Sequence, residues 1–133
     1  MIGLLIISHC NLGKELLNAV ELIVGRLEAV DSISITQTTQ SEKMLQTISK
    51  KIKMLDQGKG VLVLTDMFGG TPSNLSLSFL KEEMVEVLTG VNLPMVVAIV
   101  QDRDHVSLGE LGERAQKAGK RSIALAGQLL KAQ

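Results

Sequence analysis

The segment MIGLLIISHCNLG, residues 1–13, indicates the fold class more clearly than any other part of the chain. Residues 1–7 are almost continuously aliphatic, which is typical of a strand buried on both faces of a parallel sheet. From Leu12 onward the apolar residues recur about every 3.6 positions, as they do on one face of an amphipathic helix. Asn11 is the predicted N-cap of that helix, and Gly25 lies near its expected end. We therefore expect a buried strand followed by a helix that covers it.

The same alternation continues along the rest of the chain. Strands are predicted at residues 32–36, 60–65 and 85–88, and helices at residues 41–55, 75–80, around Pro94 and at 108–118. Residues 122–126 are a candidate for a final strand. Strands that alternate with helices pair in parallel through right-handed crossovers. We therefore predict an α/β fold with an open, mostly parallel sheet and helices on both faces, built as a single domain over residues 1–133.

Composition and charge exclude several function classes. Hydrophobic residues make up 45% of the chain and aromatic residues only 2%, which suits aliphatic helices packed on an aliphatic sheet. The 14 Lys and Arg residues balance the 14 Asp and Glu residues, so a nucleic-acid partner is not expected. No apolar run reaches the roughly 18 to 20 residues needed to span a bilayer, so direct membrane insertion is not expected either. The single cysteine and the lack of a secretory signal pattern favour a cytoplasmic protein.

Two of the predicted strands end in conspicuous polar residues. His9 closes the first strand, and Asp66 follows the strand of residues 60–65. Functional groups of an open parallel sheet gather beyond the carboxyl ends of its strands. If these two strands are neighbours, the Asp66 carboxylate holds one ring nitrogen of His9 and leaves the other unprotonated and nucleophilic. Taken alone, each residue is more simply interpreted as a polar strand end or a turn residue, and only the pair favours a catalytic site.

The segment GGTPSN, residues 69–74, follows Asp66 closely and has the composition of an anion-binding loop. Its two glycines let the backbone approach a ligand, while its Thr and Ser side chains and the first amides of the next helix can point at a phosphoryl group. The simpler interpretation is an ordinary turn with a Ser/Thr cap and Pro72 in the first helical turn. The chain contains no Walker loop and no G-x-G-x-x-G after a strand, so nucleotide binding has little support.

Other reactive side chains receive no role. Cys10 lies beside His9, but the chain has no second cysteine, and its other histidine, His105, lies in the loop-like segment QDRDH. Cys10 is therefore interpreted as a small residue packed under the loop rather than as a catalytic thiol. We expect no metal site and no cofactor.

Three features occur in the same order and at comparable spacing in a known family: the histidine that ends the first strand, TDMFGGTPSN (residues 65–74) and GVNLPM (residues 90–95). Through them the chain resembles, over nearly its whole length, the IIA component of the mannose-family sugar phosphotransferase system. The pattern Asp-x-x-Gly-Gly-[Ser/Thr]-Pro-x-Asn is the most specific of the three.

The resemblance implies a phosphotransferase that works as a phosphoryl carrier with a phosphohistidine intermediate. It implies that the small protein HPr donates a phosphoryl group to His9, and that the group passes to a IIB component for sugar uptake and phosphorylation. Asp66 would orient the ring through Nδ1 and leave Nε2 to accept the group. By the same resemblance, the loop beside the histidine would be formed by Gly69, Gly70, Thr71, Ser73 and Asn74.

The resemblance also implies a homodimer with a sheet of strand order 2-1-3-4 and a C-terminal antiparallel strand that is exchanged between subunits. Residues 122–126 are the candidate for that strand. One position departs from the family pattern, because the family commonly has glycine directly after the active histidine and this chain has Cys10. The backbone at this turn must therefore accommodate a side chain.

Other functions use the same residues. The phosphotransfer subunit of a dihydroxyacetone kinase resembles the same family and would deliver the phosphoryl group to a nucleotide on another subunit. A regulatory binding module would keep the fold without transferring phosphate, and Cys10 is the feature that favours it. A hydrolase that uses His9 and Asp66 to activate Ser73 is disfavoured, because Ser73 lacks the G-x-S-x-G elbow.

Overall fold

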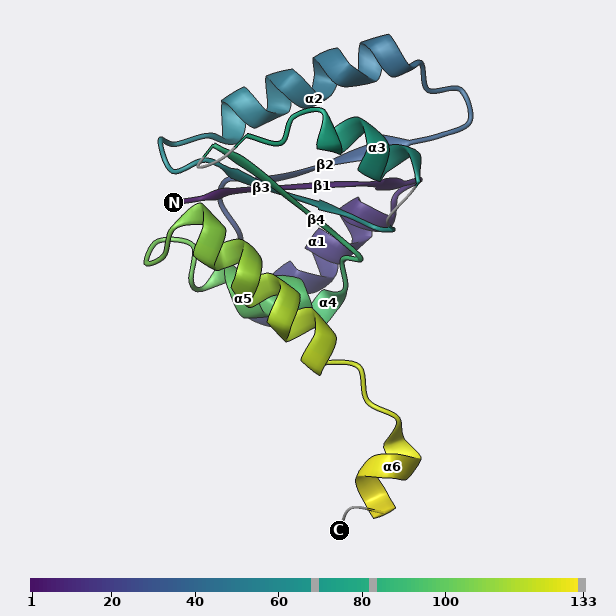
Figure 1. The fold of residues 1–133 in the computed structure, drawn as a ribbon, viewed down its shortest axis with the longest axis vertical. Coiled ribbons are helices and arrows are strands. Elements are labelled where there is room, and N and C mark those ends of the chain that lie inside the picture. The colour runs from purple at the N-terminus through teal and green to yellow at the C-terminus, as the bar shows by residue number, and fades with distance from the viewer. Residues whose placement is uncertain (68–69, 82–83, 132–133) are drawn as a thin grey trace.

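The computed structural model describes residues 1–67, 70–81 and 84–131. Within these ranges the chain alternates between strands and helices from β1 to α4, as the sequence predicts, and two further helices follow (Figure 1). In chain order the elements are β1 (Gly3–His9), α1 (Leu12–Val24), β2 (Val30–Ile35), α2 (Ser41–Leu55), β3 (Val61–Thr65), α3 (Thr71–Leu77), β4 (Val85–Thr89), α4 (Leu93–Val100), α5 (Leu108–Arg121) and α6 (Ala126–Lys131).

The strands form one parallel sheet in the order β2-β1-β3-β4. The predicted α/β class and the strand order implied by the resemblance are therefore confirmed. Ile7 of β1 pairs with Ile33 of β2 and with Thr65 of β3, so the carboxyl ends of these strands lie at the same edge of the sheet. Figure 1 shows α2 and α3 on one face of the sheet and α1, α4 and α5 on the other.

Local backbone geometry sets the start of α3 and the end of α1. The helix predicted at residues 75–80 is α3, which begins earlier, at Thr71, because Pro72 is preorganised for the first helical turn. The helix predicted from Leu12 is α1, which ends at Val24, next to Gly25 as predicted, although the apolar spacing continues to Leu27. Gly25 has φ +96°, a left-handed backbone that stops the helix.

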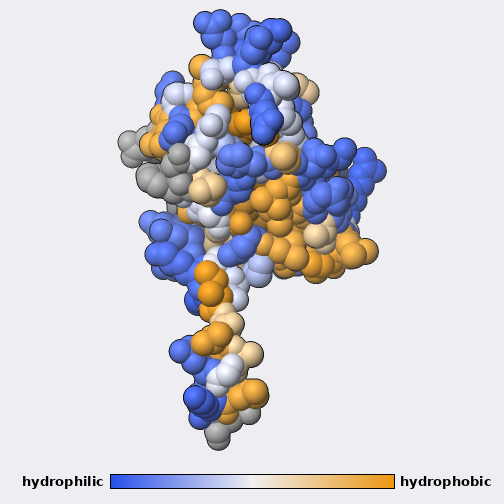
Figure 2. All heavy atoms as spheres, turned by 90° about the vertical axis from the view of Figure 1, so that its right-hand side faces the viewer, coloured by the Kyte–Doolittle hydropathy of each residue, from blue (hydrophilic) through white to orange (hydrophobic). Residues whose placement is uncertain are grey.

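The C-terminal segment leaves the body of the domain. Residues 122–126, predicted as a strand, do not form one within this chain: residues 122–125 connect α5 to α6, and Ala126 already begins α6. A strand requires a neighbouring edge, and no described strand pairs with this segment. Figure 1 shows α6 below the body, and Figure 2 shows the segment projecting into solvent with apolar and polar residues on its surface.

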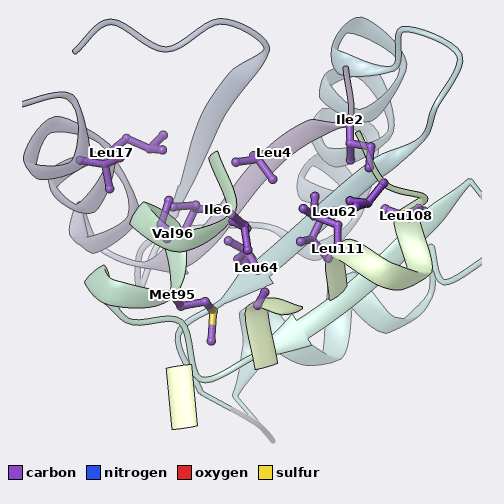
Figure 3. Packing of buried hydrophobic residues seen from close by; sticks show 14 residues of the cluster. Ile2, Leu4, Ile6, Leu17, Leu62, Leu64, Met95, Val96, Leu108 and Leu111 are labelled. Carbon is purple, nitrogen blue, oxygen red and sulfur yellow. The ribbon is translucent and has the colours of Figure 1, made fainter. Parts of the chain in front are cut away.

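Aliphatic side chains pack on both faces of the sheet, because β1 and β3 are buried along nearly their whole length. Leu4 and Ile6 of β1 belong to the cluster under α1, α4 and α5, part of which Figure 3 shows. Leu5 and Ile7 belong to the cluster under α2. Burying each such side chain contributes about 1.5–3 kcal/mol. Burial on both faces explains why the first strand is a continuous aliphatic run.

Candidate functional site

The candidate site lies at the carboxyl edge of the sheet, where β1 and β3 end side by side. The chain crosses from β1 to β2 in one direction and continues to β3 in the other, so this is the point where the strand order reverses. Open parallel sheets bind ligands at such points. His9 ends β1, and Asp66 follows the last residue of β3. The predicted neighbourhood of these two strands is therefore confirmed.

The Asp66 carboxylate holds His9 at two positions. Its Oδ2 atom accepts the backbone N–H of His9 at 2.8 Å and lies 2.8 Å from the ring nitrogen Nδ1. Its Oδ1 atom accepts the backbone N–H of Met67 at 3.0 Å. Because an ionised carboxylate can only accept, Nδ1 carries the proton, and Nε2 of the neutral ring has a free lone pair. No hydrogen bond to Nε2 is formed by any residue that the structure describes.

Exposure differs between the two partners. The Asp66 side chain is 10% exposed, whereas the His9 side chain is 48% exposed. Burial raises the pKa of Asp66, but the backbone N–H of His9, its ring and the amide of Met67 together outweigh this effect and lower the pKa below its ordinary value. Asp66 is therefore ionised at neutral pH, and the ring that it holds remains accessible from solvent.

The turn after His9 depends on a residue that the sequence analysis did not single out. Ser8 is fully buried, and its Oγ atom accepts the backbone N–H of Gly13 at 2.7 Å and donates to the carbonyl of Cys10 at 3.4 Å. Ser8 thus takes the capping role predicted for Asn11, whose side chain accepts from the Ser34 hydroxyl at 3.1 Å instead. The sequence contained one signal for this contact: a Ser that ends a strand buried on both faces and lies five residues before Gly13 of the next helix.

Cys10 accommodates its side chain in an uncommon backbone conformation. Its φ is +50°, in the left-handed region where glycine is favoured. Its N–H donates to the carbonyl of Ile35 at 2.8 Å, which fixes the turn, and the residue is exposed rather than packed under the loop as predicted. The backbone at this turn therefore accommodates the Cys10 side chain in the left-handed conformation.

The predicted loop lies only partly beside His9. A Cβ atom at Gly70 would lie 3.1 Å from Cε1 and 3.7 Å from Nε2 of His9, so this glycine packs against the ring. Thr71 and Asn74 are exposed on α3. Ser73 is fully buried, and its hydroxyl has no hydrogen-bond partner among the described residues. Gly69 lies outside the residues that the structure describes.

The described ranges hold neither a candidate metal-binding cluster nor a helix that could span a membrane. Residues 1–67, 70–81 and 84–131 contain no group of three or more His, Cys, Asp or Glu side chains that could hold a metal ion. None of the helices in this part of the chain is long and apolar enough to cross a bilayer.

Comparisons with known proteins point to one family. The family model EIIA-man, described as PTS system fructose IIA component, matches residues 3–116. The PTS system mannose-specific EIIAB component of Escherichia coli K12 is 32% identical over 92% of this chain, but the chain spans only 38% of that relative's length. The PTS system sorbose-specific EIIA component of Lacticaseibacillus casei is 29% identical over 86% of this chain and 83% of that relative.

Solved structures show the same fold. The phosphotransferase system component EIIA from Streptococcus agalactiae superposes with a TM-score of 0.87 at 27% identity, covering 96% of this chain and 99% of that one. The PTS IIA protein associated with the fucose utilization operon of Streptococcus pneumoniae gives 0.82 at 29% identity, over 96% and 95% of the two chains. The chain belongs to the EIIA-man family, the IIA components of the phosphotransferase system, whose members act in phosphoryl transfer during sugar uptake.

Proposed function

We propose that this chain carries a phosphoryl group on Nε2 of His9, accepting it from HPr and passing it to a IIB component in the cytoplasm. The observation that carries the proposal is the 2.8 Å contact between Nδ1 of His9 and Asp66 on a ring that is 48% exposed. This contact anchors Nδ1 and leaves Nε2 available to a phosphoryl donor. A protein donor can reach that nitrogen without entering a cavity.

The transfer needs no cofactor. The Nε2 lone pair of neutral His9 attacks the phosphorus of phosphorylated HPr, and a new N–P bond forms. The old P–N bond breaks, and its electron pair returns to the donor ring. The phosphorylated His9 ring retains its proton on Nδ1 and bears positive charge, which the ionised Asp66 at 2.8 Å stabilises. The reverse sequence of bonds delivers the group to the IIB component.

The loop beside the ring supplies donors for the phosphoryl oxygens in this proposal. Gly70 has no side chain to block the space near Nε2. The N-cap of α3 is Gly70, which has no side chain that could cap the helix, so the amides of Thr71 and Ser73 and the exposed Thr71 hydroxyl are the donors that we propose. Gly69 and Asn74 complete the proposed loop.

We also propose that the functional unit is a homodimer. β4 forms one edge of the sheet, and a groove beside it is lined by Val85 and Glu86 of β4 and by the start of α5. The segment after α5 exposes Ile123 and Leu125, which alternate with smaller residues as in a strand. An antiparallel strand from a second copy would satisfy the backbone groups of β4 and bury these side chains.

Phosphorylation in vitro tests the proposed carrier function. The chain is incubated with phosphoenolpyruvate, enzyme I and HPr, and its intact mass is measured. We expect one acid-labile, base-stable phosphoryl adduct that is absent in His9→Ala and retained in the matched variant His105→Ala, because His105 is the other exposed histidine. An unmodified chain with functional donors, or an adduct that persists in His9→Ala, would contradict the proposal.

The role of Asp66 is measured in the same assay. Hydrogen bonds to charged groups contribute about 1.5–3 kcal/mol, so Asp66→Asn should slow phosphorylation by roughly 10- to 100-fold. Adding a mannose-type IIB protein should then remove the phosphoryl group. Release only to the nucleotide of a dihydroxyacetone kinase would assign the chain to that relay instead.

A further inference from the structure

A small apolar cavity lies at the amino edge of the sheet, beside the first residue of β4. It has a volume of about 220 Å³, and its apolar lining residues are Ile52, Phe79, Met84 and Val85. This volume is below the roughly 300–1,000 Å³ of typical small-molecule pockets, which favours one or two protein side chains as its occupant. Met84 is 46% exposed, and Leu80, which follows Phe79, is 53% exposed, so apolar surface remains open around the cavity.

The C-terminal helix α6 exposes side chains that match this cavity. Leu129 is 58% exposed and Leu130 is 72% exposed, and no residue of α6 is buried. Neither leucine belongs to a core cluster of the described residues. A helix as short as α6 is marginal in water unless its apolar side chains pack against another surface. Its leucines therefore require a surface that covers them.

The course of α5 determines which surface α6 can reach in the proposed dimer. Helix α5 begins beside the start of β4, because Leu108 and Val85 line a common cavity. It ends beyond the other end of β4, where the Nδ2 atom of Asn92 donates to the carbonyl of Gly119 at 3.2 Å. Figure 1 shows the same course, from the amino edge of the sheet toward its carboxyl edge. The exchanged strand therefore starts at the carboxyl edge, and two-fold symmetry joins equivalent edges of the two copies there.

An antiparallel exchanged strand then runs back to the amino edge of the second copy. The candidate strand, residues 122–126, has the same length as β4, which has 5 residues. Full antiparallel pairing therefore places Ala126 opposite Val85 of the second copy. Helix α6 begins at Ala126, and Leu129 follows three residues later, after about 5 Å of helix. Because Val85 itself lines the apolar cavity, the leucines of α6 lie at its mouth.

The cavity on the other face of β4 is less suitable for leucine. It lies on the side of α5, and its lining includes the charged residues Lys59, Glu86 and Glu110. An apolar side chain placed there would take charged groups out of water without giving them a partner. The apolar cavity on the side of α2 carries no such cost for its aliphatic and aromatic lining.

We infer that α6 of one copy docks in the apolar cavity of a second copy, with Leu129 and Leu130 against Phe79 and Met84. The inference rests on the proposed homodimer and goes beyond it, because it assigns a binding surface to a helix that lies outside the exchanged strand. The docking surface lies at the amino edge of the sheet, whereas His9 ends β1 at the carboxyl edge. Docked α6 therefore leaves the His9 ring uncovered.

Cross-linking tests this contact, because Cys10 is the only cysteine of the chain. In a Cys10→Ser background, a chain with Leu129→Cys is co-expressed with a differently tagged chain with Met84→Cys, and the purified protein is treated with a short bis-maleimide. We expect a mixed cross-linked dimer. In the matched control, Leu22→Cys replaces Met84→Cys. Leu22 is 89% exposed but lies on α1, on the other face of the sheet, so this pair should give no mixed product.

Sedimentation measures the contribution of the same contact to dimer stability. We expect Leu129→Ser to raise the dissociation constant of the dimer by about tenfold or more, as the loss of a central apolar anchor does at other interfaces. Gln128→Ser changes the preceding, exposed position of α6 and should leave the dissociation constant unchanged.

The outcomes separate failure of the docking from failure of the dimer. A dimer in which Leu129→Cys cross-links equally to Met84→Cys and Leu22→Cys would overturn the docking, as would a dissociation constant that Leu129→Ser does not change. Cross-linking within a single chain that carries both Leu129→Cys and Met84→Cys would mean that α6 covers the cavity of its own chain. A wild-type chain that sediments only as a monomer would contradict the proposed homodimer itself.

Discussion

At the scale of single residues, one carboxylate oxygen organises the site. Oδ2 of Asp66 lies 2.8 Å from both the backbone nitrogen and Nδ1 of His9, so one atom fixes the position of the strand end and the tautomer of the ring. The sequence predicted this pairing on the condition that the two strands are neighbours, because the ends of neighbouring parallel strands meet at one edge. The burial of Ser8 and Ser73 could not be predicted, because it depends on helices that pack from other parts of the chain.

The lowered pKa of Asp66 makes its stabilising effect pH-dependent. The unfolded-state value is about 3.8, and a carboxylate with a lower folded-state pKa stabilises the fold above the unfolded value and loses this effect as pH falls through the folded-state pKa. We expect the difference in unfolding free energy between wild type and Asp66→Asn to be largest above about pH 5 and to shrink below about pH 4. Urea unfolding followed by circular dichroism measures it, and a difference that grows on acidification would disagree.

Gly70 tests how closely the loop packs on the ring. In Gly70→Ala the new Cβ would lie 3.1 Å from Cε1 of His9, inside the usual contact distance of about 3.5–4.0 Å. Gly70 has φ −82°, which any residue adopts, so the effect is on the ring rather than on the backbone. We expect phosphorylation to slow by roughly tenfold while the fold is retained.

Gly109→Ala is the matched control for this substitution. A Cβ atom at Gly109 meets no atom within 4 Å, and the residue lies inside α5. This variant should phosphorylate as fast as the wild type and gain up to about 1 kcal/mol in stability. Equal phosphorylation rates in the two variants would show that the loop is not held against His9.

At the scale of elements, the start of α1 shapes the turn that presents His9. Ser8 provides the cap from the preceding strand. Helix α1 can approach β1 there because position 13 is glycine: a Cβ atom at Gly13 would lie 2.8 Å from Cγ2 of Ile6. The sequence predicted the existence of this strand and helix but not the capping residue. The preference of Asn for N-cap positions is a local rule, whereas the Ser8 contact arises from tertiary packing.

Removing the Ser8 cap should destabilise the fold. In Ser8→Ala the buried N–H of Gly13 loses its acceptor, which costs about 1–2 kcal/mol. Ser34→Ala serves as a control, because its partly exposed hydroxyl donates to an exposed Asn11 side chain and should contribute less than about 0.5 kcal/mol. Urea unfolding measures both. Equal stability of the two variants would mean that other contacts fix the start of α1.

Arg103 shows a further limit of local reasoning. It stands between Asp102 and Asp104 in a segment that the sequence indicates to be a solvated loop. The residue is nevertheless buried, and its Nη1 atom donates to the carbonyls of Ile2 at 3.3 Å and Ala29 at 3.2 Å. Arg103 thus links the residue that precedes β1 to the residue that precedes β2. Nothing in the charge pattern distinguishes it from an exposed arginine.

At the scale of the whole molecule, the order of the sheet was predictable only through the resemblance. The alternation of strands and helices predicts a parallel α/β sheet, but the hydrophobic pattern of each strand does not identify its neighbours. The free edge of β4 and the projecting residues 122–131 likewise follow from the assembled fold. The proposed dimer would use two such features, the exposed edge of β4 and the exposed apolar side chains of residues 122–131.

Removing the residues after Arg121 should abolish the proposed dimer. We expect the full chain to sediment as a dimer and a chain truncated after Arg121 to sediment as a folded monomer, because residues 122–131 are exposed and lie outside the core. Replacing Ile123 and Leu125 by Asp should have the same effect, whereas Leu22→Asp, at a more exposed position on α1, should leave the dimer intact. A dimeric truncated chain, or a monomeric full chain, would contradict the proposed exchange.

Nuclear magnetic resonance of the His9 ring in the ¹⁵N-labelled, phosphorylated protein examines the proposed chemistry most directly. Long-range proton–nitrogen correlations identify which nitrogen carries the phosphoryl group and which carries the proton. We expect the phosphoryl group on Nε2 and the proton on Nδ1, where Asp66 lies 2.8 Å away. A phosphoryl group on Nδ1, or an unmodified His9 ring in the phosphorylated protein, would contradict the proposal that Asp66 reserves one nitrogen for structure and leaves the other for transfer.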